Sequence, residues 1–443
     1  MKELQEEVCT KVLLVGLDTG DDPEFDHSME ELKSLAEAAN KKVAGIITQR
    51  MGGVNKAYYI GTGKVKETRE YAEECGAEEV IFDNTLTPSQ MRNLGQELNL
   101  PVLDRTNLIL DIFALRARTR EAKLQVETAR LQYILPRLVG MRENLSRQGG
   151  STGGNTGGTR SNRGAGETKL ELDKRKIEHR IAELKRELEE VTQNRETMRK
   201  RRRQSRIPKV ALVGYTNAGK STIMNRMLEI YGANEDKAVL EKDMLFATLD
   251  THVRRIHPGQ SGGGGKAVSA DLSPFFLADT VGFINKLPHG LVKAFRSTLE
   301  EVRYADLIVE VVDFSDAFYR QHMEVTDETL RELEAGDIPR IIVYNKSDKS
   351  DLEDIPKKKN RQIYMAAGLG KGIRELTEMI EECVYADRVE REFMLPYDKG
   401  DIVAYFRENA TVLRQEYCEN GVRLRVNCHK NDAEKYLSYA SAI

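Results

Sequence analysis

Two spacings of apolar residues alternate along the first 115 residues of the chain. Short apolar runs bounded by polar residues predict strands at residues 11–17, 41–48, 79–84 and 100–104. Between these runs, apolar residues at helical spacing predict helices at residues 28–39, 64–74 and 90–98. Strands that alternate with helices are typical of a parallel, doubly wound α/β sheet. We therefore predict an N-terminal α/β domain over residues 1–118.

A helical pattern that is interrupted once by glycines occupies residues 119–206. In its first arm, four leucines recur every seven residues: Leu124, Leu131, Leu138 and Leu145. Pro136 lies in this arm and is expected to kink the helix. The second arm also carries apolar residues at largely heptad spacing, which suits packing against a partner helix. The two arms predict an antiparallel helical hairpin.

The segment between the arms is rich in glycine and carries Arg147, Arg160 and Arg163. From Arg120 to Lys209 there are 23 lysines and arginines against 12 acidic residues, although the whole chain has a formal net charge of −3. A basic block in an otherwise acidic chain favours a polyanion as partner, and a glycine-rich loop can follow an RNA surface. The same composition also fits a slack linker between solvated helices, so both interpretations stay open at this point.

Strands and helices alternate again after this block, and we predict a second α/β domain over residues 207–386. The apolar runs that predict its strands lie at residues 210–214, 275–279, 307–313, 340–345 and 362–366. From Arg388 the pattern becomes strand, helix, strand, strand, helix, with Asn420-Gly421 as the turn between the last two strands. This pattern predicts a small α+β domain over residues 387–443.

Cysteine usage and hydropathy limit the class of protein. The five cysteines are widely spaced and include no C-x-x-C pair, which argues against a disulfide framework and against a zinc site. The N-terminal residues lack the apolar core of a signal peptide, and no apolar run approaches the roughly 18 residues that cross a bilayer. We expect a cytoplasmic monomer with no membrane span and no DNA partner.

The run at residues 210–213 leads directly into the sequence GYTNAGKST. This sequence matches G-x-x-x-x-G-K-[ST] between a strand and a helix, as a phosphate-binding loop requires. In such a loop, backbone N–H groups surround the phosphates, the lysine reaches the β- and γ-phosphates, and the hydroxyl ligates Mg²⁺. The predicted nucleotide contacts from this segment are Gly214, Asn217, Ala218, Gly219, Lys220, Ser221 and Thr222.

Two further motifs follow apolar runs later in the chain. Asp279 opens D-T-V-G and is expected to hold Mg²⁺ through water, while the N–H of Gly282 senses the γ-phosphate. Asp348 ends N-K-S-D and can accept hydrogen bonds from N1–H and the exocyclic amine of guanine, an amine that adenine lacks. Lys346 can lie along the base, and Asn345 can tie this loop to the phosphate loop. The three motifs in this order predict a P-loop domain that binds and hydrolyses GTP rather than ATP.

Two weaker signals complete the predicted site. Thr248 lies where a mobile switch is expected and can ligate Mg²⁺ when the γ-phosphate is present, with Thr251 and Thr222 as alternatives. Ala366 and Ala367 supply backbone for the guanine carbonyl. The predicted catalytic groups are Lys220, Thr248 and Gly282. The predicted metal ligands are Ser221, Thr248 and Asp279.

Beyond these motifs, the chain resembles the HflX family of translation-associated GTPases. The matching segments are YIGTGKVKE at 59–67, Asp104-Arg105-Thr106 with LQVETARLQYILPRL, GAGETKLELDKRKI, and DTVGFINKLPHGLVKAFRSTLEEV. The resemblance implies binding to the large ribosomal subunit and, with GTP, separation of ribosomes stalled under stress. It also implies that the hairpin reaches ribosomal RNA, which makes Arg147, Arg160 and Arg163 the expected RNA contacts.

The resemblance also bears on the mechanism. Many switch GTPases place a glutamine after Asp-x-x-Gly to orient the attacking water, and here that residue is Phe283. We therefore expect slow hydrolysis by the protein alone and faster hydrolysis on ribosomes. Asn217 stands where some related GTPases coordinate K⁺, and a hydrogen bond within the loop is its alternative role.

The chain departs from the family pattern in two places. Residues 261–269 form a glycine-rich insert where a short connection is expected. Ala366-Ala367 replaces the usual Ser-Ala, and loss of the hydroxyl is expected to loosen that loop.

Two other functions stay compatible with the sequence. One is a nucleotide-switched RNA-binding or ribosome-assembly scaffold that separates no subunits. The other is an RNA-remodelling ATPase with a second nucleotide site at Gly61-Thr62-Gly63-Lys64, although this motif lacks the full spacing of a phosphate loop.

Overall fold

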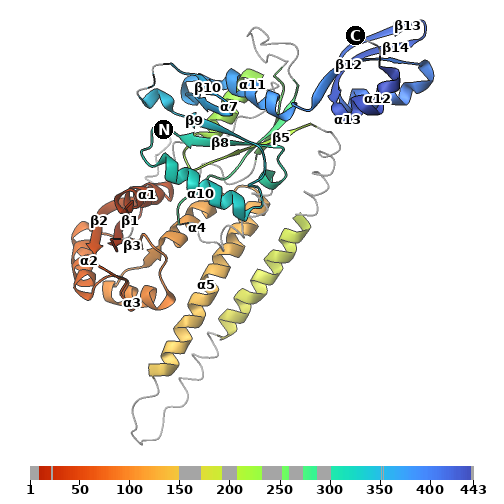
Figure 1. Ribbon diagram of the computed structural model, residues 1–443. Coiled ribbons are helices and arrows are strands. Elements are labelled where there is room, and N and C mark those ends of the chain that lie inside the picture. Colours follow the sequence, from red (N-terminus) through yellow and green to blue (C-terminus); the bar gives the residue numbers. More distant parts are fainter. Residues whose placement is uncertain are drawn as a thin grey trace, which may run out of the picture. The chain divides into compact units, whose positions relative to one another are not determined.

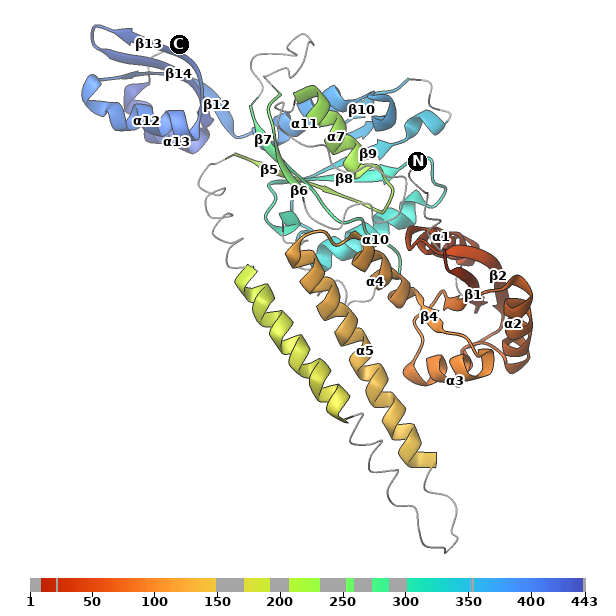
Figure 2. The ribbon, with the colours of Figure 1, turned by 180° about the vertical axis from the view of Figure 1, so that it is seen from behind.

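The chain divides into two compact units (Figures 1 and 2). The computed structural model describes residues 9–20, 23–148, 171–191, 207–231, 252–258, 273–286, 301–350, 352 and 354–440. The first unit comprises residues 1–192, 243–250 and 286–295. The second unit comprises residues 193–242, 251–285 and 296–443. Among the described residues, no helix combines the length and the apolar character needed to cross a bilayer.

The first unit contains a four-stranded parallel sheet in the order β2-β1-β3-β4. Its strands are β1 (Lys11–Asp18), β2 (Lys42–Arg50), β3 (Glu79–Phe82) and β4 (Val102–Asp104). Its helices are α1 (Phe25–Ala38), α2 (Thr62–Cys75), α3 (Pro88–Leu98) and α4 (Arg105–Arg116). This confirms the predicted parallel α/β arrangement. Helix α4 was not predicted because most of its residues are buried, so its apolar residues do not follow a clear helical period.

The hairpin also belongs to the first unit. Helix α5 (Arg120–Gln148) continues through Pro136. Residues 171–191 form the second helix. Arg120 pairs with Glu187 at 3.1 Å, and Arg180 pairs with Glu127 at 2.9 Å. Because the partners run in opposite directions along the two helices, the helices are antiparallel, as both ribbon views show.

The second unit contains a seven-stranded sheet in the order β10-β11-β9-β8-β5-β7-β6. Its strands are β5 (Lys209–Val213), β6 (His252–Ile256), β7 (Phe275–Asp279), β8 (Leu307–Asp313), β9 (Arg340–Asn345), β10 (Lys357–Lys359) and β11 (Gln362–Tyr364). The five inner strands run parallel, whereas β6 and β10 are antiparallel edge strands. Those two edges were not predicted, because β10 consists of three lysines and β6 contains two arginines.

Alternation along β5 explains how this sheet is covered. Val210 and Leu212 join a core cluster with α7 (Lys220–Tyr231) and α11 (Ile373–Val384). Ala211 and Val213 point to the opposite face and pack in a cluster with Leu330 of α10 (Tyr319–Glu332). The carboxyl ends of the parallel strands are left to loops, and in sheets of this kind ligands bind at that edge.

The C-terminal residues form the predicted α+β arrangement. A three-stranded antiparallel sheet in the order β12-β14-β13 is built from β12 (Arg388–Leu395), β13 (Thr411–Cys418) and β14 (Gly421–His429). Helix α12 (Gly400–Asn409) follows β12, and α13 (Lys430–Lys435) follows β14. Phe406 of α12 stacks on Phe393 of β12 within this small core.

Candidate nucleotide site

The loop between β5 and α7 takes a conformation that only glycine allows at two positions. Gly214 has φ +138° and Gly219 has φ +98°. A Cβ on Gly214 would lie 2.1 Å from the carbonyl oxygen of Val311, and a Cβ on Gly219 would lie 2.2 Å from Nδ2 of Asn345. The phosphate-loop glycines therefore permit both the turn and its close approach to β8 and β9.

Lys220 folds back over this loop from the first turn of α7. Its Nζ donates hydrogen bonds to the carbonyl oxygens of Gly214 at 3.0 Å and Tyr215 at 2.8 Å. Burial lowers the pKa of Lys220 to about 8, and the charge of Asp279 opposes this shift. The ammonium is thus held against the backbone of the phosphate loop.

Ser221 and Asp279 meet although they lie on different elements. The Ser221 hydroxyl donates to Oδ2 of Asp279 at 2.7 Å, and Asp279 is completely buried at the end of β7. A hydroxyl and a carboxylate are oxygen donors of the kind that Mg²⁺ prefers. These two residues therefore suit a Mg²⁺ ion at this position.

The segment after Asp279 is fastened to the phosphate loop by its backbone. Phe283 N–H donates to the carbonyl of Gly214 at 3.1 Å, and Phe283 C=O accepts from the N–H of Thr216 at 2.8 Å. A Cβ on Gly282 would lie 3.0 Å from Nζ of Lys220, so the glycine brings its backbone next to the lysine. Gly282 therefore lies beside the lysine of the phosphate loop, and its contact with a γ-phosphate stays a prediction.

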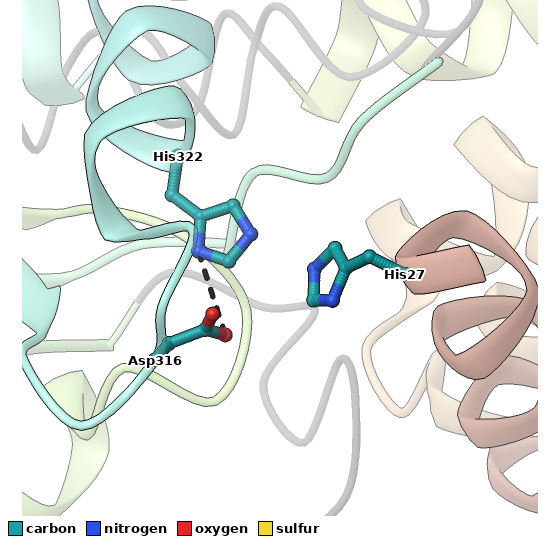
Figure 3. Close-up of side chains that lie close together, drawn as sticks. All are labelled: His27, Asp316 and His322. Atoms are coloured by element: carbon teal, nitrogen blue, oxygen red, sulfur yellow. Dashed lines mark ion pairs between the residues drawn. The ribbon is translucent and has the colours of Figure 1, made fainter. Parts of the chain in front are cut away.

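Tyr215 is a contact that the sequence did not reveal. Its hydroxyl accepts a hydrogen bond from the N–H of Asn285 at 2.7 Å. Its ring stacks on that of His322 of α10, with centroids 3.8 Å apart and planes 10° apart. Nδ1 of His322 lies 3.9 Å from Oδ2 of Asp316 (Figure 3, where His27 of the first unit is also drawn). Helix α10 thereby supports the loop that follows Gly282.

Asn345 joins three loops at the other end of the site. Its Nδ2 donates to the carbonyl of Ala218 at 2.9 Å, which is the tie to the phosphate loop that the sequence predicted. Its Oδ1 accepts the N–H of Ala367 at 2.9 Å. The side chain is almost completely buried, so it braces the loops and leaves contact with the base to its neighbours.

The predicted base contacts next to Asn345 are Lys346 and Asp348 on its own loop and Ala367 on the neighbouring loop. Lys346 adopts φ +57°, and its Nζ lies 2.8 Å from Oδ2 of Asp313. Asp348 is exposed on the short 3₁₀ turn Ser347–Lys349, where its carboxylate can receive a ligand. Because the N–H of Ala367 already donates to Asn345, a guanine carbonyl there would have to share that donor.

Ala366 does not leave its loop open. Its N–H donates to the carbonyl of Lys371, and its own carbonyl accepts from the N–H of Lys371, both at 3.1 Å. Two backbone bonds therefore close the loop without the missing serine hydroxyl.

Several predicted residues lie outside this geometry. Thr248, its alternative Thr251, the insert at 261–269, Arg160 and Arg163 lie outside the described residues. Arg147 belongs to α5, but its side chain is not described. Thr222 follows Ser221 in α7. Asn217 is exposed with φ +59° and makes no hydrogen bond to the described residues, so a potassium contact and a bond within the loop both remain hypotheses.

Family models match most of the chain. The model described as GTP-binding GTPase N-terminal matches residues 26–114, and GTP-binding GTPase Middle Region matches residues 116–202. The model described as 50S ribosome-binding GTPase matches residues 209–346.

Individual relatives match over almost their whole length. GTPase HflX of Caldanaerobacter subterraneus subsp. tengcongensis is 43% identical over 403 residues, which cover 91% of this chain and 88% of the relative. GTPase HflX of Escherichia coli K12 is 38% identical, with 89% of this chain and 87% of the relative covered. Among solved structures, the complex of SsGBP with GDP has 25% identity and a TM-score of 0.46, with 85% of this chain and 99% of the other covered.

Proposed function

Because this chain belongs to the HflX family of GTPases, we propose that it binds the large ribosomal subunit in its GTP-bound state and separates stalled ribosomes into subunits. The nucleotide part of this proposal is supported by the direct link between the phosphate loop and the loops predicted to bind the guanine base. Asn345 makes that link, because one side chain bonds both Ala218 and Ala367. Because the proposed partner is the ribosome, the proposed location is the cytoplasm.

In this proposal each part of the site has one role. Lys220 and the N–H groups of the loop hold the β- and γ-phosphates, and the N–H of Gly282 contacts the γ-phosphate. Asp348 accepts hydrogen bonds from N1–H and the amine of guanine, which selects guanine over adenine. Ser221 and Asp279 hold Mg²⁺, with Thr248 as a third ligand, and the ion neutralises phosphate charge.

Potassium is a second ion to test. Asn217 is exposed in the phosphate loop, and its side chain carries an amide oxygen, a group that can coordinate a cation. We propose that K⁺ binds there and raises the rate of hydrolysis. Turnover in KCl that equals turnover in NaCl would remove this role from Asn217.

The hairpin is the proposed RNA-binding arm. Its two helices are linked by the ion pairs Arg120–Glu187 and Arg180–Glu127, and in the sequence residues 149–170 connect them and include Arg160 and Arg163. Arginines in such a connection can bring charge to an RNA backbone, and binding of this kind weakens with salt. Arg147, Arg160 and Arg163 are the proposed RNA contacts.

Sedimentation with purified ribosomal particles tests the proposal. With a nonhydrolysable GTP analogue the protein should pellet with large subunits, and with GDP it should stay in the supernatant. Intact ribosomes incubated with protein and GTP should yield free subunits on a sucrose gradient. Nucleotide-dependent binding without free subunits would instead favour the RNA-binding or assembly scaffold, and binding independent of nucleotide would contradict both functions.

A further inference from the structure

The residue after Gly282 contributes no side chain to the nucleotide site. Phe283 is 3% exposed, and its ring packs in a core cluster with Val213 and Ile308. An apolar ring in this position cannot hold the water that attacks GTP. If the domain orients that water by itself, another side chain has to supply the polar contact.

Thr216 and Lys220 both lie next to Gly282. A Cβ built on Gly282 would lie 2.8 Å from Cα and 2.9 Å from Cγ2 of Thr216, and 3.0 Å from Nζ of Lys220. Thr216 and Lys220 therefore pack closely against Gly282, whose N–H is proposed to contact the γ-phosphate. Thr216 also holds Phe283 through its own N–H, so its backbone position is fixed.

Within the described part of the chain, the Thr216 hydroxyl makes no hydrogen bond. The residue is 6% exposed, and Oγ1 has no hydrogen-bond partner among the described residues. A buried hydroxyl without a hydrogen-bond partner is energetically unfavourable. Such a group is therefore a candidate to form a hydrogen bond with a ligand or a water molecule. The methyl group now faces Gly282, and one rotation of about 120° around Cα–Cβ would place the hydroxyl there.

We propose that the Thr216 hydroxyl orients the attacking water, in place of the glutamine that Phe283 replaces. Oγ1 accepts a hydrogen bond from the water, whose oxygen forms a new bond to the γ-phosphorus. The bond from the γ-phosphorus to the β–γ bridging oxygen breaks, and its electron pair leaves with GDP. The water proton passes to an oxygen of the γ-phosphoryl group, so Thr216 gains and loses no proton. The inference rests on GTP hydrolysis and is independent of any ribosomal partner.

Three variants of the full-length protein test this role. Thr216→Val keeps the shape and removes the hydroxyl, whereas Thr216→Ser keeps the hydroxyl and removes the methyl group. Thr377→Val is the matched control, because Thr377 is a fully buried threonine whose hydroxyl bonds the carbonyl of Ile373 in α11. Single-turnover hydrolysis at saturating GTP gives the rate of the chemical step. The dissociation constants for GDP and for a nonhydrolysable GTP analogue report binding separately.

For Thr216→Val we expect the rate to fall roughly 10- to 100-fold, a size typical of losing a group that positions a reactant. Both dissociation constants should stay within about twofold of wild type, because the interaction forms only with the attacking water. Thr216→Ser should retain most of the rate, and Thr377→Val should hydrolyse as wild type does. The proposal fails if Thr216→Val keeps the wild-type rate, if Thr216→Ser falls as far as Thr216→Val, or if GDP affinity falls together with the rate.

Discussion

Each unit contains an α/β sheet whose inner strands run parallel, but the carboxyl ends of those strands are occupied differently in the two units. In the second unit, Lys220 folds over the phosphate loop, Asp348 is exposed, and Ser221 and Asp279 present oxygen donors together. In the first unit the equivalent edge is filled by the protein's own side chains. A fold therefore places polar groups at this edge, but the pairing of those groups decides whether a ligand can use them.

The carboxylates of the first unit illustrate this saturation. Asp83, after β3, accepts hydrogen bonds from Arg105 at 2.7 Å and from Ser28 and Lys286 at 2.8 Å each. Arg105 is 1% exposed and also pairs with Glu31. Such a network serves packing and leaves little room for an incoming phosphate.

The glycine-lysine motifs of the two units differ in the same way. The N–H of Gly61 donates to Oε1 of Gln49 at 2.8 Å, and α2 begins at the next residue without a wrapping loop. Lys64 pairs with Glu67 on its own helix at 2.7 Å, whereas Lys220 turns back toward the strand that precedes it. This geometry disfavours the second nucleotide site that Gly61-Thr62-Gly63-Lys64 suggested.

The largest expected effect is on unfolding free energy, and it distinguishes charges that stabilise the fold from charges that bind a ligand. Arg105→Met should leave Asp83 and Glu31 as buried, poorly paired charges, which typically costs about 3–5 kcal/mol of unfolding free energy. We expect the first unit to unfold at a clearly lower temperature in calorimetry, while the second unit keeps its affinity for GTP. Arg69→Met is the matched control, because its pair with Glu73 is exposed and should contribute below about 1 kcal/mol. Equal melting of both variants would contradict the assigned role of Arg105.

The next effect compares the two lysines directly. Lys220→Ala should slow GTP hydrolysis by roughly 100- to 1000-fold, the usual cost of one lost electrostatic contact to a transition state. Lys64→Ala should leave hydrolysis unchanged, because its ammonium pairs with Glu67 on its own helix. Both rates should be measured under one condition. A slower rate for Lys64→Ala than for Lys220→Ala would contradict the assignment of the nucleotide contact to Lys220.

The smallest effect follows from the pKa of Lys220. Burial lowers this pKa to about 8 without nucleotide, and a bound polyphosphate should raise it, because negative charge favours the ammonium. Binding should therefore take up protons at pH 9 and almost none at pH 7, and GTP affinity should fall as the pH rises above 8. Calorimetry in two buffers of different ionisation enthalpy measures this uptake. Lys220→Arg, which stays charged, should bind without it, and an equal uptake by that variant would assign the proton to another group.

Sequence predicted the parts of the structure that repeat a pattern and missed the parts that depend on contacts. Short apolar runs revealed the inner strands, and motifs of fixed spacing revealed Lys220, Asp279 and Asn345. The edge strands β6 and β10 escaped because charged residues in them resemble loop sequence. Tyr215 and Thr216 escaped because a phosphate loop tolerates any residue at those positions, so only the fold reveals that they face Asn285 and Gly282.

Titration calorimetry with both purine nucleotides tests the contrast between the two units most directly. A nonhydrolysable GTP analogue should bind the full-length protein at a single site per chain, and Asp348→Ala should abolish most of that binding. A nonhydrolysable ATP analogue should produce no binding heat, since the described residues of the first unit form no phosphate loop and the second unit is expected to reject adenine. Saturable binding of the ATP analogue that persists in Lys220→Ala would place a nucleotide in the first unit and contradict the account.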